Sequence, residues 1–155
     1  MPIQIATFKA ICMQCQSVFS IPLLPDQAFG EFIAWGENGK AAVYLSAYED
    51  GNWDYIISLY HQVTGGPLSD IEKETNCVQW LIGRCLDTVE GENLSIMGGP
   101  VCPACHSHRV GYGNSIKTGG VTLQDATFGQ FSSLNKNGQI EHIRELLGSY
   151  LQIRR

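Results

Sequence analysis

Cys12-Met13-Gln14-Cys15 and Cys102-Pro103-Ala104-Cys105 are two Cys-x-x-Cys pairs that lie far apart in the chain. Four thiolates in two such pairs can complete one tetrahedral zinc site, with Zn–S bonds of about 2.3 Å and no further ligand. A redox Cys-x-x-Cys normally opens a helix after a strand, and only Pro103 fits that pattern here. A second alternative is that the thiols pack without metal. We predict a structural Zn²⁺ site whose ligands are Cys12, Cys15, Cys102 and Cys105.

Strand-like patterns flank both cysteine pairs. Residues 3–11 alternate between two faces and predict a strand that leads into the first pair. A return strand over 18–24 is bounded by prolines, and a short strand over 109–112 follows the second pair. Gly119-Gly120 then predicts a hinge. The order of strand, Cys-x-x-Cys and strand is typical of a zinc ribbon. Here a long insertion separates the two halves of the ribbon, and it is tolerable because the entropy cost of closing a loop grows only slowly with loop length.

The remaining segments predict a hairpin and helices. Residues 31–35 and 41–45 flank Asn38-Gly39, a pair that favours a tight turn. Apolar residues at helical spacing predict helices near 53–64 and 69–88, the second opened by the capping box Ser69-Asp70-Ile71-Glu72. After the second cysteine pair, Asp125 can cap a helix over 125–134. Asn135-Lys136-Asn137-Gly138 interrupts the pattern before a last helix over 139–152.

Together these elements predict an α+β fold. A zinc ribbon is joined to a small antiparallel sheet and about four helices. The 155 residues suit one domain with a sizeable core. We expect a single domain over 1–155, with a helical insertion at 53–90 and C-terminal helices at 125–152.

Charge and composition narrow the functional classes. The net charge is −5, and Lys and Arg are scattered apart from a terminal pair. A phosphate-binding surface is usually basic, so nucleic acid is not the expected partner and a basic protein is the better complement. The first residues lack the pattern of a signal peptide, and no apolar run reaches the ~18 residues of a membrane span. We expect a cytoplasmic protein, where six cysteines are explained by metal and core packing.

Other candidate catalytic groups lack a supporting pattern. The sequence contains no nucleotide-binding loop, nucleophile elbow, HExxH or EF-hand, so we do not expect an enzyme. His106 and His108 could replace a ligand, but four cysteines already close the site, which favours a surface role. Cys77 and Cys85 lie about two helical turns apart, too far for a disulfide, and should pack in the core. A hydrolase built around Cys85, with Asp87, or around His106 remains a third alternative.

An acidic and aromatic stretch is the candidate contact surface. Aromatic anchors ringed by carboxylates suit a basic partner, although such charges more often form a solvated face. The residues concerned are Tyr48, Glu49, Asp50, Trp53, Asp54 and Tyr55.

The two cysteine pairs also carry a resemblance. Together with the amphipathic pattern of the last predicted helix, they make the chain resemble small bacterial zinc-ribbon proteins that have a long insertion between the two cysteine pairs. This resemblance implies that the four cysteines are metal ligands, and that the chain is an immunity protein that neutralises a cognate antibacterial toxin by direct occlusion. The alternative function is a zinc-ribbon nucleic-acid-binding or transcription accessory protein. It would require folding to cluster Lys9, Lys40, Arg109 and Lys117.

Overall fold

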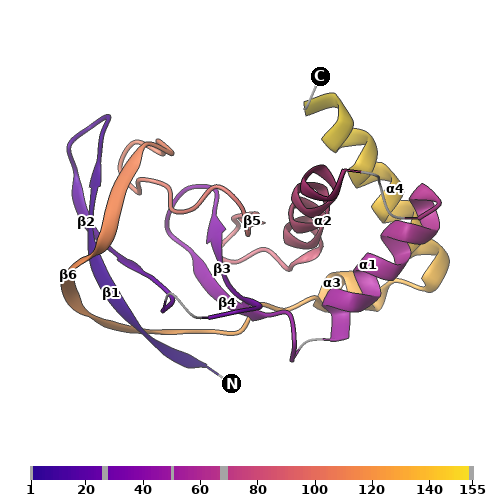
Figure 1. Ribbon diagram of the computed structural model, residues 1–155, viewed down its shortest axis with the longest axis horizontal. Helices are drawn as coiled ribbons and strands as arrows, with labels where there is room; N and C mark the ends of the chain where they lie inside the picture. Colours follow the sequence, from indigo (N-terminus) through magenta and orange to yellow (C-terminus); the bar gives the residue numbers. More distant parts are fainter. Residues whose placement is uncertain (1, 26–27, 50, 67–69, 154–155) are drawn as a thin grey trace.

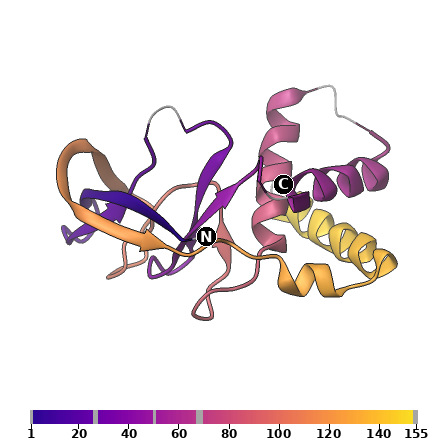
Figure 2. The ribbon, with the colours of Figure 1, turned by 90° about the horizontal axis from the view of Figure 1, so that it is seen from below.

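The computed structural model describes residues 2–25, 28–49, 51–66 and 70–153. Two three-stranded antiparallel sheets and four helices lie in a row, with the first sheet at one end and the helices at the other (Figures 1 and 2). The predicted α+β fold is confirmed. The first sheet has the strand order β2 (Val18–Pro22), β1 (Ile3–Cys12) and β6 (Val110–Leu123). The second sheet has the strand order β4 (Ala42–Ser46), β3 (Glu31–Gly36) and β5 (Leu94–Ser95). The helices are α1 (Gly51–Thr64), α2 (Ile71–Cys85), α3 (Gly129–Ser133) and α4 (Lys136–Ile153).

The first sheet places the two cysteine pairs at one end. β2 returns along β1 with Ile11 opposite Val18, as predicted. β6 pairs with the whole of β1, so the strand predicted over 109–112 is present but extends to Leu123, and the hinge at Gly119-Gly120 was a wrong prediction. Register shifts on either side of Phe8 absorb the extra residues of β6, and Gly119 lies beside one shift at φ +146°. A bulge with a glycine in an unusual conformation therefore replaces the expected hinge.

The second sheet is the predicted hairpin with one further strand. β3 and β4 pair antiparallel, with Trp35 opposite Ala42. The two-residue strand β5 was not predicted; it pairs with the end of β3 within a glycine-rich connection. The chain leaving β6 runs beside β4, where the Tyr44 N–H donates to Gln124 O (2.9 Å) and the Ala126 N–H donates to Tyr44 O (2.7 Å). The two sheets are thereby joined by backbone hydrogen bonds.

The main core lies between the second sheet and the helices. Side chains from α1, α2 and α4 meet those of β3 and β4, and the most deeply buried include Ile56, Leu59, Leu81, Ile82 and Ile143. A smaller cluster joins the two sheets and contains Ile5, Ile33, Tyr44 and Leu123. Among the described helices, none is long and apolar enough to span a bilayer.

Three helix starts differ from the predictions. Asp70 caps α2 by accepting from the Lys73 N–H, while Ser69 lies outside the described residues. The α4 helix starts at Lys136, because the Asn135 side chain accepts from the Gly138 N–H at 2.8 Å. The predicted break is therefore a helix cap. Asp125 does not cap α3, since it forms a bridge with Tyr44; Asp87 supplies that cap instead.

Candidate metal centre

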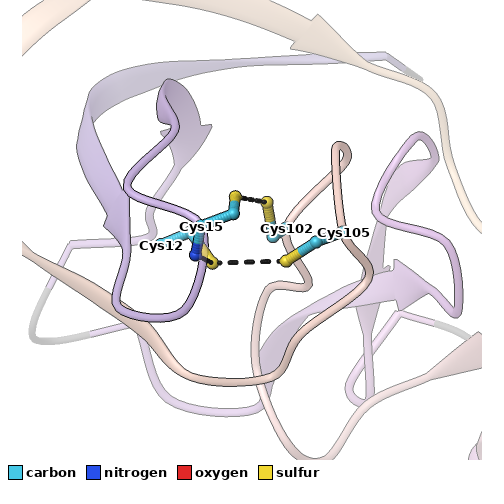
Figure 3. A group of neighbouring side chains, drawn as sticks. All are labelled: Cys12, Cys15, Cys102 and Cys105. Atoms are coloured by element: carbon cyan, nitrogen blue, oxygen red, sulfur yellow. Dashed lines mark hydrogen bonds between the residues drawn. The ribbon is translucent and has the colours of Figure 1, made fainter.

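The four predicted cysteines come together at the end of the first sheet (Figure 3). Cys12 Sγ lies 3.5 Å from Cys105 Sγ, and Cys15 Sγ lies 3.7 Å from Cys102 Sγ. All four sulfur atoms lie within 4.8 Å of one another. Tetrahedral ligands with bonds of about 2.3 Å are separated by about 3.8 Å. The cluster is therefore close enough to hold a metal ion.

The two cysteine pairs have the same backbone arrangement. The Cys12 N–H donates to Ser17 O at 2.9 Å, and the Gln16 N–H donates to Cys12 O at 3.0 Å. In the second pair, the Cys102 N–H donates to Ser107 O and the His106 N–H to Cys102 O, both at 2.9 Å. Gln16 and His106 adopt φ values of +66° and +63°. Each pair is thus a preformed turn that aims two sulfur atoms at one point.

A sequence signal for this equivalence was overlooked. Both pairs read Cys-x-x-Cys-x-Ser, and the serine five positions after the first cysteine closes each turn through its carbonyl oxygen. Ser17 also lies 3.1 Å from Cys15 Sγ through its hydroxyl. The Met13 N–H donates to Arg109 O at 2.8 Å and links the first turn to the segment that follows the second turn. Backbone bonds, rather than the sulfur atoms alone, hold the turns in register.

Charge on the sulfur atoms depends on these contacts. The Ser17 hydroxyl and the Ser17 N–H lower the pKa of Cys15 to about 6. For Cys105 the Ser107 N–H acts in the same direction, but burial and the neighbouring thiols outweigh it and raise the pKa to about 12. Four thiolates so close together repel one another without a cation, and a bound divalent ion deprotonates its thiol ligands. The cluster is chemically suited to such an ion.

Neither nearby histidine joins the cluster. His106 and His108 are exposed, and among the described residues the group that could hold a metal contains cysteines only. The positive φ of His106 gives it a backbone role at the end of the turn. The arrangement is consistent with the expected surface role for both side chains.

The two other cysteines are buried in α2. Cys77 is 7% exposed and Cys85 is 3% exposed. Cys85 and His142 line the same hollow of about 490 Å³. The two residues are remote in sequence, so no local pattern could predict that they share it. Burial raises the pKa of Cys85 to about 12, so its thiol stays protonated near neutral pH. The Asp87 carboxylate accepts hydrogen bonds from Thr127, Gly129 and Gln130.

The acidic and aromatic stretch divides into exposed and packed residues. Tyr48, Glu49 and Asp54 are exposed. Trp53 stacks on Phe32 with ring centroids 5.0 Å apart. Tyr55 is half-buried and donates a hydrogen bond to Gln139, whereas Asp50 lies outside the described residues. Trp53 and Tyr55 therefore contribute mainly to packing against neighbouring elements.

The register of the first sheet bears on two of the four basic residues named above, Lys9 and Lys117. Lys9 is opposite Ser20 in β2, and Lys117 is opposite Phe8 of β1. Consecutive residues of a strand project to opposite faces. The register therefore directs Lys9 and Lys117 to different faces, although the nucleic-acid alternative requires them to cluster.

Comparison with protein-family models, with curated proteins and with solved structures finds no match to this chain. The resemblance to bacterial zinc-ribbon proteins therefore stays a prediction that rests on the two cysteine pairs.

Proposed function

We propose that this chain is a non-enzymatic binding protein that is stabilised by a structural zinc ion and occludes a basic protein partner. The observation that carries this proposal is the cluster of four cysteine sulfur atoms within 4.8 Å. Four sulfur ligands complete the tetrahedral set of zinc and leave no open position for water or substrate. An ion held in this way favours a scaffold role over catalysis.

The proposed ion would join segments that are remote in sequence. Residues 16–101 separate the two cysteine pairs, and the second pair lies in a connection without regular secondary structure. Structural zinc supplies roughly 10–16 kcal/mol of apparent binding free energy in small domains. Binding would therefore anchor this connection to the end of β1. We place the protein in the cytoplasm, where thiols are kept reduced and remain available as metal ligands.

The net charge of −5 supports a basic partner. Opposite charges accelerate association by electrostatic steering, which suits an inhibitor that must capture its target quickly. Together with the resemblance carried by the cysteine pairs, this charge leads us to propose an immunity protein for an antibacterial toxin. Toxins that attack nucleic acid are typically basic, and direct occlusion requires no chemistry from the inhibitor.

Co-expression with the product of the neighbouring upstream reading frame tests the proposal. We expect that product to arrest growth when expressed alone, and this chain to restore growth and co-purify with it in a stoichiometric complex. A chain from an unrelated reading frame serves as the control and should not restore growth. Toxicity that persists without any complex would contradict the immunity role. A salt-sensitive mobility shift with nucleic acid would instead support the alternative function.

A further inference from the structure

We infer that the open end of the β3–β4 hairpin is the partner-contact surface, and that it receives a basic side chain and an adjacent aliphatic side chain of a protein partner. This inference rests on the proposed function and names the surface through which it would operate. The surface, here termed the hairpin end, comprises Phe29, Glu31, Tyr48, Glu49 and Asp125 with the two hollows beside them. It extends the predicted stretch to residues remote in sequence and omits the packed Trp53 and Tyr55.

Two aromatic side chains project from the hairpin end. Phe29 and Tyr48 are each 80% exposed. The Ala47 N–H donates to Gly30 O at 2.7 Å, which extends the β3–β4 ladder and places Phe29 and Tyr48 at facing positions. A Cβ on Gly30 would lie 2.2 Å from the Tyr48 ring, so that ring rests directly on the Gly30 backbone. Exposed aromatic rings held by backbone contacts can bind a partner at low entropic cost.

An acidic hollow is lined in part by Glu49, the residue that follows Tyr48 in the chain. It has a volume of about 350 Å³, and its walls include Tyr44, Ser46, Glu49 and Asp125. Burial and the nearby Glu31 and Glu49 carboxylates raise the pKa of Tyr44 to about 12, which is consistent with a negative local potential. Of the described residues, no lysine or arginine lines the hollow. Its size and charge suit the end of a lysine or arginine side chain.

An apolar hollow lies on the other side of a shared wall. It measures about 380 Å³ and is lined by Ile3, Ile5, Phe8, Leu23, Leu24 and Pro25, with Glu31 as its acidic member. The Tyr44 hydroxyl donates a hydrogen bond to Glu31, so the two hollows meet at this pair. A partner segment with one basic and one aliphatic side chain would fill both.

Charge complementarity selects this partner over other occupants. A second copy of the chain in a symmetric dimer would place the same carboxylates opposite one another. A nucleic acid would bring phosphates to Glu49 and Asp125. Both arrangements juxtapose like charges, which opposes binding. A basic protein segment is attracted by the negative charge of the carboxylates and can also contact the aromatic rings, because cations bind the faces of such rings.

Nuclear magnetic resonance with a peptide probe tests this surface without knowledge of the natural partner. The probe is a six-residue peptide of alternating leucine and arginine, and its control replaces each arginine with glutamine. At low salt we expect saturable shifts of the backbone amides of Phe29, Tyr48, Glu49 and Ala126, with a Kd below about 1 mM. The glutamine peptide should bind at least about tenfold more weakly. Shifts confined to other regions, or no saturable shifts, would overturn the inference.

Matched variants distinguish this surface from general acidity. Phe29→Ser combined with Tyr48→Ser should weaken binding at least about tenfold, and Glu49→Lys should do the same. Glu145→Lys makes the same change in net charge on an exposed position of α4 and should change the Kd by less than about twofold. Equal effects of the two charge variants would overturn the inference. If the peptide shifts these amides but co-expression does not restore growth, the immunity role is rejected and this surface stands. If co-expression restores growth but the peptide causes no such shifts, this surface is rejected and the immunity role stands.

Discussion

Gly39 in the β3–β4 turn lies directly against Val101, the residue before the second cysteine pair: a Cβ on Gly39 would lie 2.3 Å from the Val101 carbonyl oxygen. The turn itself is held by the buried Glu92 carboxylate, which accepts from the Asn38 N–H at 2.6 Å and the Ala41 N–H at 2.8 Å. The hairpin therefore supports the metal centre from one side, while the β1–β6 ladder supports it from the other.

Replacing Gly39 with alanine should destabilise the protein and loosen the metal centre. Gly39 has φ +78°, and the new methyl group would meet backbone rather than a movable side chain. We expect a loss of roughly 2–4 kcal/mol in the free energy of unfolding, together with faster metal release to a chelator. Denaturant unfolding and the rate of zinc transfer to a colorimetric chelator measure the two effects.

Gly148→Ala is the matched control for this variant. Gly148 lies in α4 with open space around the position of a Cβ. Alanine is the better helix former, so this variant should gain up to about 1 kcal/mol and release metal at the original rate. Equal losses of stability in the two variants would contradict the proposed support by the hairpin turn.

Cys15→Ser should abolish tight zinc binding and lower the melting temperature. Cys15 is exposed, so the loss cannot be attributed to a cavity in the core. Elemental analysis should find one zinc ion per chain in the unsubstituted protein and less than one in the variant. The melting temperature of the variant should no longer respond to chelator. Gln14→Ala changes an exposed side chain between the two ligands and should retain both the ion and the response to chelator. A chelator that removes the metal without shifting the melting temperature would exclude a structural role.

Local patterns were sufficient to predict much of the fold and the cysteine cluster. Cys-x-x-Cys spacing, the turn signal at Asn38-Gly39 and the helical spacing of apolar residues each depend on residues close in sequence, and all correspond to observed elements. The cluster of four cysteines followed because two such pairs complement each other chemically.

The features that were missed depend on contacts between remote residues. The length of β6 is set by pairing with β1, which no local pattern in residues 113–119 encodes. The start of α3 is set by Asp87, about 40 positions earlier in the chain. The exposure of Phe29 follows from its position opposite Tyr48 beyond the β3–β4 ladder, which no local pattern encodes. Tertiary context decided each of these cases.

Replacing Asp87 with alanine should cost about 1–2 kcal/mol at neutral pH, because its carboxylate caps α3 from outside the helix. Burial raises the pKa of Asp87, but hydrogen bonds from Thr127, Gln130 and Gly129 outweigh it and hold the pKa below its ordinary value. A depressed carboxyl pKa stabilises the fold above the unfolded pKa of about 3.9, and this contribution is lost as the pH falls through the folded pKa. The cost of the substitution should therefore shrink between about pH 4 and pH 2. Urea unfolding of both proteins across this range measures it, with Glu145→Gln as a control whose effect on stability should remain small throughout.

Cys85 should resist alkylation in the folded protein, and this prediction separates a binding protein from a thiol hydrolase. Its side chain is 3% exposed, and burial raises its pKa to about 12. At pH 8 a thiol with this pKa is ionised to a fraction of only about 10⁻⁴, and the thiolate is the reactive form.

Iodoacetamide treatment followed by peptide mass spectrometry should show slow modification of Cys85 and Cys77, and faster modification of Cys15 once a chelator has removed the metal. The chain unfolded in guanidinium is the control, in which Cys85 should react like an ordinary thiol. Rapid and selective modification of Cys85 in the folded protein would instead require an activated thiolate, for which His142, in the same hollow, is a candidate base.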